Sequence, residues 1–126
     1  MLALARQHHT GAAQPVERLA ADQGIPPNYL VQILIELKAR RILKSVRGRE
    51  GGYLLARPPA QITFADVLSA VHGEVFDAAA LSNPQCPPEL RAAWQTVKRA
   101  FEEAAEGINF QQLLEQAEEK QKMYYI

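Results

Sequence analysis

The fold is decided by residues 25–56, which read IPPNYLVQILIELKARRILKSVRGREGGYLLA. The first half of this stretch has apolar side chains at helical spacing and predicts a helix over residues 28–41. The expected core face of that helix carries Tyr29, Leu30, Ile33, Leu34 and Leu37. The second half contains two β-like runs, 42–46 and 53–56, around a tip with three glycines in six residues, which is typical of a hairpin.

The preceding residues predict a partner for this helix. Residues 1–9 favour a first helix. Pro15 then suits a first helical position, and an apolar stripe follows it up to Gly24. Two helices joined by a tight turn that contains glycine are typical of a helix-turn-helix, and a hairpin directly after it is a wing. The fold class that we expect is therefore mainly α with a small β-wing.

The charge is divided between the two halves of the chain. The formal net charge is zero, but residues 1–60 carry nine basic and four acidic side chains, whereas residues 61–126 carry five basic and ten acidic ones. Such asymmetry indicates a part that binds a polyanion, joined to a part with another role. Six cations, which we call the basic cluster, fall within twelve residues: Lys38, Arg40, Arg41, Lys44, Arg47 and Arg49.

The face of the 28–41 helix opposite its core residues predicts contacts with DNA bases. Asn28 and Gln32 lie there and suit hydrogen bonding to base edges, with Gln matching adenine. Val31 and Ile35 on the same face could meet thymine methyl groups. Tyr29 is ambiguous, because its ring belongs to the core face while its hydroxyl could reach a phosphate.

The basic cluster supplies the expected backbone contacts. Lys38, Arg47 and Arg49 are placed to pair with phosphates, and the two arginines at the hairpin tip also suit a narrow minor groove. The alternative is a solvated helix face beside a charged hairpin, as charge runs usually are. The helix-turn-helix context favours DNA.

The second half predicts a dimerisation helix. Thr63 and Asp66 resemble a capping box that starts a helix ending at Gly73, and residues 74–88 form an irregular connection. A long helix then begins near residue 89, followed by a shorter one capped by Asn109 and Gln112. The long helix repeats apolar residues at alternating spacings of four and three, as in a coiled coil: Leu90, Trp94, Val97, Phe101, Ala104 and Ile108. We therefore expect a DNA-binding domain over residues 1–73, a connecting loop over 74–88, and dimerisation helices with a tail over 89–126.

Four motifs together resemble the Rrf2 family of winged-helix regulators. They begin at Pro27 (PNYLVQ), Leu43 (LKSVRG), Gly51 (GGYLLARP) and Ile62 (ITFADV). The resemblance covers nearly the whole chain. It implies a homodimer in which the long helix pairs with its mate, bound to a partly palindromic operator in double-stranded DNA. Members of the family usually have about ten more residues before the first helix.

Many members of the family hold an iron–sulfur cluster on three cysteines before the long helix. This chain has one cysteine, Cys86, and the resemblance places the last cluster cysteine near Pro88. One thiol per subunit is too few for a cluster, so we expect no metal and no cofactor. A redox or iron–sulfur sensor using Cys86 is the alternative.

The chain ends in Tyr124, Tyr125 and Ile126. This apolar terminus either packs back on the dimer or offers its carboxylate to a partner's pocket. It resembles the tail of the cluster-free, CymR-like branch of the family, which represses cysteine-metabolism genes. That resemblance implies cysteine synthase as a partner that binds the tail.

Other classes of protein fit less well. No nucleophile–base pair or phosphate loop is recognisable, so we expect no enzyme. The sequence contains no apolar run long enough to cross a membrane and no signal peptide, and a single cysteine suits the cytoplasm. A protein-interaction module that does not bind DNA is the remaining alternative, and it would tolerate the loss of Gln32, Arg47 and Arg49.

Overall fold

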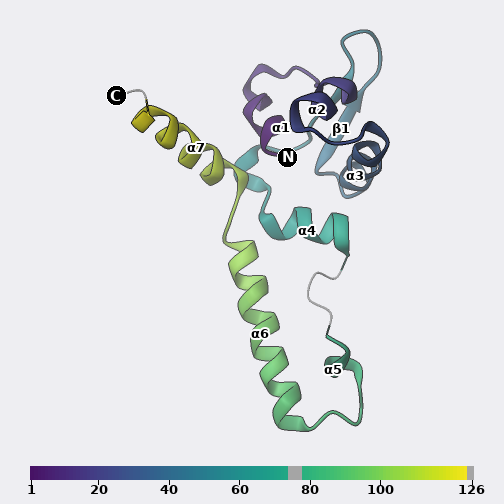
Figure 1. Cartoon of the computed structure of the whole chain (residues 1–126), viewed down its shortest axis with the longest axis vertical. Coiled ribbons are helices and arrows are strands. Elements are labelled where there is room, and N and C mark those ends of the chain that lie inside the picture. The colour runs from purple at the N-terminus through teal and green to yellow at the C-terminus, as the bar shows by residue number, and fades with distance from the viewer. Residues whose placement is uncertain (74–77, 125–126) are drawn as a thin grey trace.

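A computed structural model describes residues 1–73 and 78–124 of the chain. The structure is mainly helical, with one two-stranded antiparallel sheet, which confirms the expected fold class. Figure 1 shows a rounded unit from which one long helix extends. The elements in chain order are α1 (Leu2–Arg6), a 3-10 turn (His8–Thr10), α2 (Val16–Gln23), α3 (Pro27–Ala39), β1 (Leu43–Val46), β2 (Gly52–Leu55), a second 3-10 turn (Pro59–Gln61), α4 (Phe64–His72), α5 (Ala79–Ser82), α6 (Pro88–Glu106) and α7 (Phe110–Tyr124).

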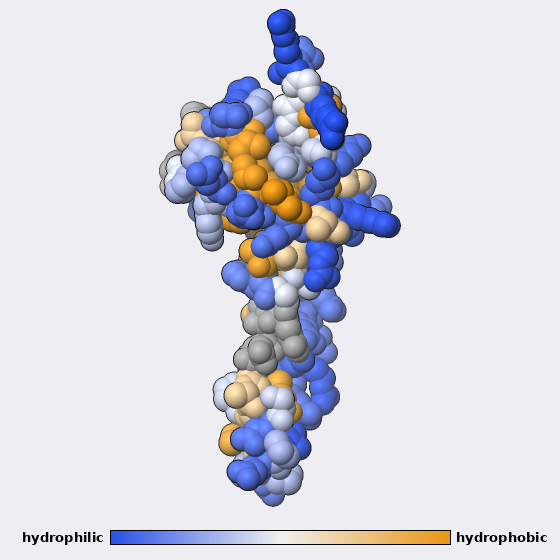
Figure 2. All heavy atoms as spheres, turned by 90° about the vertical axis from the view of Figure 1, so that its right-hand side faces the viewer, coloured by the Kyte–Doolittle hydropathy of each residue, from blue (hydrophilic) through white to orange (hydrophobic). Residues whose placement is uncertain are grey.

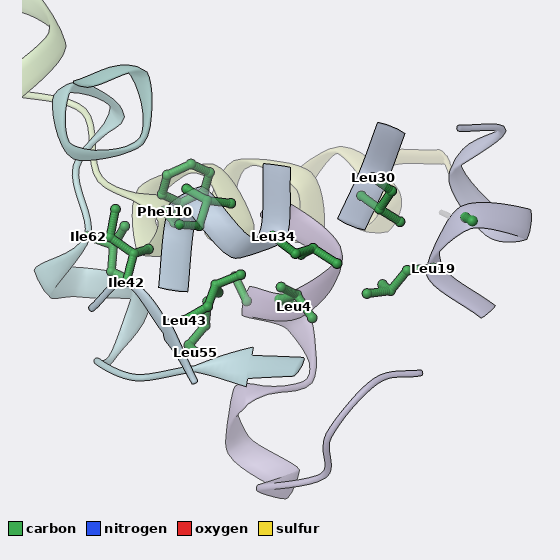
Figure 3. Packing of buried hydrophobic residues seen from close by; sticks show 12 residues of the cluster. Leu4, Leu19, Leu30, Leu34, Ile42, Leu43, Leu55, Ile62 and Phe110 are labelled. Atoms are coloured by element: carbon green, nitrogen blue, oxygen red, sulfur yellow. The ribbon is translucent and has the colours of Figure 1, made fainter. Parts of the chain in front are cut away.

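The core of the rounded unit is built from residues far apart in the sequence. Figure 3 shows buried side chains converging from the helices, from the hairpin and from Ile62, which follows the second 3-10 turn. The most deeply buried are Ile42, Leu43, Leu55 and Ile62. Phe110, the first residue of α7, is buried in the same cluster. The last helix therefore completes the core of the unit that contains α3.

The expected helix boundaries are mostly confirmed, with two corrections. The helix expected over residues 1–9 ends at Arg6 and is followed by the 3-10 turn His8–Thr10, which Gly11 ends in a left-handed conformation (φ 69°). The segment expected to be irregular contains the one-turn helix α5, and its residues 74–77 lie outside the described part of the chain.

The capping boxes predicted for two helices are both present. At α4, the Thr63 hydroxyl accepts from the Asp66 N–H at 3.1 Å, while the Asp66 carboxylate accepts from the Thr63 N–H at 3.0 Å. At α7, Asn109 and Gln112 exchange the equivalent bonds, at 2.9 and 3.2 Å. Both helix starts are thereby fixed locally, by side chains three residues apart.

The two capped starts are also bonded to each other. Phe64 donates its N–H to the Ile108 carbonyl at 2.7 Å, and Phe110 donates to the Ile62 carbonyl at 3.1 Å. These bonds hold the α6–α7 junction against the beginning of α4. Beyond this junction α6 runs away from the core with α5 beside it (Figure 1). Within the described ranges, no helix is long and apolar enough to cross a membrane.

Candidate nucleic-acid interface

Helix α3 has one buried face and one free face. Leu30, Leu34 and Leu37 are buried, as their spacing predicts. Asn28 and Gln32 are exposed on the opposite face, and Ile35 on the same face is 48% exposed. Polar groups that can read base edges therefore point to solvent together with an apolar one.

The structure corrects the prediction that the ring of Tyr29 is buried. Its ring was assigned to the core face of α3, but the residue is 63% exposed. It lies in the first turn of α3, at the edge of the buried stripe. Most of the residue is therefore accessible to a ligand on the α3 surface.

The turn between α2 and α3 fixes the angle at which α3 is presented. Gly24 ends α2 in a left-handed conformation (φ 64°), and Ile25 donates its N–H to the Ala20 carbonyl at 3.0 Å. Pro27 then occupies the first turn of α3. The connection is thus as short and as constrained as the helix-turn-helix prediction requires.

The residue that follows the end of α3 has a backbone conformation that the sequence did not predict. Arg41 has φ 60° and is the one non-glycine residue with positive φ in the described part of the chain. It donates to the Lys38 carbonyl at 2.9 Å, and Ile42 donates to the Leu37 carbonyl at 3.1 Å. This pair of bonds is a Schellman motif, in which glycine is the usual residue at this position.

The hairpin after Arg41 forms the wing. Its register pairs Leu43 with Leu55 and Val46 with Gly52, so residues 47–51 form the tip. Arg47 and Arg49 are exposed there, and Gly48 has φ 110°. Figure 2 faces this side of the molecule and shows a hydrophilic tip projecting beyond an apolar strip surrounded by hydrophilic side chains. The tip points outward, as a wing that contacts DNA must.

A third backbone segment supports the wing. Gln14 and Tyr53 exchange two backbone hydrogen bonds, at 2.8 and 2.9 Å. A Cβ atom at Gly52 would collide with the Gln14 carbonyl, so this close approach requires glycine. Gly52 therefore serves this contact as well as the turn, and nothing in the local sequence indicates the contact.

The basic cluster is exposed and electrostatically uncompensated. Each of its six side chains points to solvent, and in the ranges that the structure describes none of them forms an ion pair. Glu36 and Glu50 are the acidic residues within residues 28–50. The structure therefore brings all six predicted DNA-contact residues to the surface of α3 and the hairpin: Asn28, Tyr29, Gln32, Lys38, Arg47 and Arg49.

Helix α6 carries four of the five apolar residues predicted for dimerisation on an exposed face, and the fifth, Ile108, follows the end of the helix. They are 37–50% exposed, which is unusual for side chains of this size. We call them the apolar seam: Leu90, Trp94, Val97, Phe101 and Ile108. The start of α6 is tied to the preceding loop, because the Arg91 guanidinium donates to the Asn83 carbonyl.

The loop before α6 does not fit a three-cysteine cluster. Cys86 is the one cysteine of the chain and is half-buried, with its thiol 3.6 Å from the Pro87 carbonyl. Among the residues for which the structure gives positions, no group of three or more His, Cys, Asp or Glu side chains could hold a metal ion. The donors present therefore do not match a cluster that needs several thiolates.

The predicted partner-binding tail lies largely outside the described residues. Helix α7 ends at Tyr124, whose side chain is not described, and Tyr125 and Ile126 fall beyond the described range. Met123, immediately before them, is 80% exposed.

Comparisons with known proteins agree on one family of transcriptional regulators. The model of the Rrf2 family, described as an iron-dependent transcriptional regulator, matches residues 1–116. An HTH-type transcriptional regulator of Mycobacterium tuberculosis is 52% identical over 64 residues, which is 51% of this chain and 40% of that protein. The HTH-type transcriptional regulator CymR of Bacillus subtilis is 27% identical over 128 residues, covering 100% of this chain and 91% of CymR.

Solved structures have the same fold. The IscR structure from T. potens matches 98% of this chain and 87% of its own, with a TM-score of 0.79 and 30% identity. The structure of CymR, described as the global cysteine regulator of B. subtilis, matches 89% of this chain and 84% of its own, with a TM-score of 0.78 and 24% identity. The second likeness concerns the fold alone.

Proposed function

The chain belongs to the Rrf2 family of transcriptional regulators, and on that premise we propose that it is a homodimeric repressor that reads a partly palindromic DNA operator with α3 and the wing. The observation that carries the proposal is the exposed surface of α3 beside an uncompensated basic cluster. A buried Gln32, or a hairpin tip folded inward, would have contradicted it. Gln32 and the tip residues are both exposed.

The exposed face of α3 favours A·T base pairs. Asn28 and Gln32 suit the paired donor and acceptor of adenine, and Ile35 suits the thymine methyl group. Arginine, the usual partner of guanine, is absent from this face of α3. Arg47 and Arg49 at the wing tip complement a minor groove narrowed by A·T pairs.

The apolar seam supports the homodimer. Four large apolar side chains follow one face of α6 at heptad spacing, and Ile108 continues the spacing just beyond the helix. Water is a poor solvent for such a stripe. A second copy of α6 would cover the seam with its own. Two copies of α3 would then face two half-sites of one operator.

We further propose that the regulated genes serve cysteine or sulfur metabolism and that cysteine synthase binds the C-terminal tail. Support comes from the likeness to CymR over the whole chain, from the lack of cluster cysteines, and from the sequence of residues 124–126. The C-terminal carboxylate beside an apolar Ile126 is the kind of group that a partner's pocket can hold.

A binding assay tests the DNA proposal. Operators are first selected from a pool of random duplexes with the wild-type chain. The triple variant Gln32→Ala, Arg47→Ala, Arg49→Ala should then bind the selected DNA at least about 100-fold more weakly at 150 mM salt, because it loses a base contact and two phosphate contacts. Arg18→Ala on α2, which removes a cation paired with Asp22, should change the affinity less than about twofold. A triple variant that binds like the wild type would show that α3 and the wing do not read DNA.

Deleting Tyr125 and Ile126 tests the partner. The truncated chain should remain a folded dimer with unchanged operator affinity, and it should no longer co-purify with cysteine synthase. The matched control is Met123→Ala, which keeps the terminus and should retain the complex. If the deletion leaves the complex intact, the tail is not the contact.

A further inference from the structure

A groove of about 620 Å³ lies between α1 and α7. One side is formed by the end of α1 and the following 3-10 turn, and the other by residues 111–121 of α7. Pro59 of the second 3-10 turn closes one end. This volume falls in the range of sites that hold small molecules. We call it the α1–α7 groove.

The floor and the rim of the groove differ in chemistry. Buried or half-buried apolar side chains form the floor: Ala5, Pro59, Leu114 and Ala117. The rim carries Arg6 and Lys120 with His8 and His9, against the single carboxylate of Glu118. In the described part of the chain, neither Arg6 nor Lys120 forms an ion pair. The rim thus carries two unpaired cations against one carboxylate.

This combination selects a class of ligand. An apolar floor removes a ligand's hydrocarbon part from water, while two unpaired cations favour a negative group at the rim. A neutral molecule would use the floor alone, and an inorganic anion the rim alone. We propose that the α1–α7 groove binds a small organic anion, with an apolar body and a carboxylate or phosphate group.

The position of the groove connects binding with the proposed function. Helix α1 packs on the unit that presents α3, while α7 follows α6 and its apolar seam. A ligand that touches both α1 and α7 stabilises the arrangement in which the two are docked. The regulatory consequence rests on the proposed function, but binding of the anion does not.

An NMR titration of the labelled full chain tests the site. The probes are phenyl phosphate and phenylacetate, with phenylacetamide as the neutral match. Both anions should cause saturable shifts at His8, His9 and Ala117, and phenylacetamide should bind at least about fivefold more weakly, since each exposed charge pair contributes a factor of about two to five. If neither anion causes a saturable shift up to about 10 mM, or if phenylacetamide binds equally well, the groove is not an anion site.

Charge variants separate the site from the general charge of the molecule. The double variant Arg6→Gln, Lys120→Gln should weaken binding of phenyl phosphate at least about fivefold. Arg18→Gln with Lys122→Gln removes the same charge outside the groove and should change binding less than twofold. Equal losses in both double variants would overturn the assignment of the rim.

The last experiment measures how the anion changes the affinity of the chain for the selected operator. At a concentration near its Kd for the wild type, phenyl phosphate should change the operator affinity of the wild type measurably and that of the Arg6→Gln, Lys120→Gln variant clearly less; at saturation the change in the wild type should be at least threefold. Saturable anion binding with no change in operator affinity would refute the regulatory half of the inference. A wild-type chain that binds no DNA would instead refute the proposed function and leave the NMR result standing.

Discussion

Helices α3 and α6 are both amphipathic, but they expose opposite kinds of side chain. Helix α3 buries its leucines in the core and turns Asn28 and Gln32 to solvent, beside the basic cluster. Helix α6 buries only Ala105 and turns its apolar seam to solvent. A surface of amides and cations suits a polyanion, whereas a stripe of large apolar side chains suits another protein surface. The comparison teaches that the exposed face of each helix, and not the helix itself, indicates the partner.

The largest expected effect comes from a charge in the apolar seam. Val97→Asp should place a carboxylate in each half of the dimer interface, raising the dimer dissociation constant at least about 1,000-fold because an unpaired charge is costly to bury. Light scattering coupled to size exclusion should detect a monomer, with operator binding lost in parallel. Gln95→Asp introduces the same charge at an exposed position outside the seam and should leave the dimer intact. A dimeric Val97→Asp variant would show that α6 does not use this face for pairing.

Two neighbouring residues of α3 provide a sharper comparison. Leu34→Ala removes a buried side chain and should lower the free energy of unfolding by about 2–5 kcal/mol, because it leaves a cavity. Ile35→Ala removes an exposed one and should change stability by less than about 0.5 kcal/mol. Urea unfolding at matched protein concentration measures both. At low denaturant concentration, Ile35→Ala should bind the operator about tenfold more weakly than Leu34→Ala, because it loses a contact with one A·T pair. If the two substitutions lower the free energy of unfolding equally, α3 has no exposed face at Ile35.

The smallest expected effect concerns the end of α3. Arg41→Gly should raise the free energy of unfolding by about 0.5–1 kcal/mol, because glycine adopts φ 60° without the steric cost of a Cβ atom. Arg41→Ala removes the same charge but keeps the Cβ atom, so it should give no such gain. Thermal unfolding of the three proteins distinguishes them. A gain shared by both variants would point to relief of charge repulsion within the basic cluster instead.

The local features of the fold were predictable from the sequence because each is encoded within a few residues. The capping boxes at Thr63 and Asn109 involve partners three residues apart, and the hairpin tip depends on its own glycines. The exposed positions Asn28 and Gln32 follow from helical periodicity alone. Tyr29 was wrongly given to the core because it lies at the edge of the apolar stripe, where periodicity does not determine burial.

Contacts between distant segments needed the tertiary structure. The pairing of Gln14 with Tyr53, the bonds that join the α6–α7 junction to α4, and the burial of Phe110 among residues of the first half have no local signature. The α1–α7 groove depends on that same long-range packing, since its two walls are more than 100 residues apart in the chain.

The sequence by itself determined that a helix-turn-helix with a cationic wing precedes a helix with a heptad seam, since helical period, glycine content and charge are properties of short stretches. Only the tertiary structure decided which faces of these elements remain exposed and that α7 packs into the core of the unit that contains α3. Burial depends on what packs against a residue, and the packing partners here come from the opposite end of the chain.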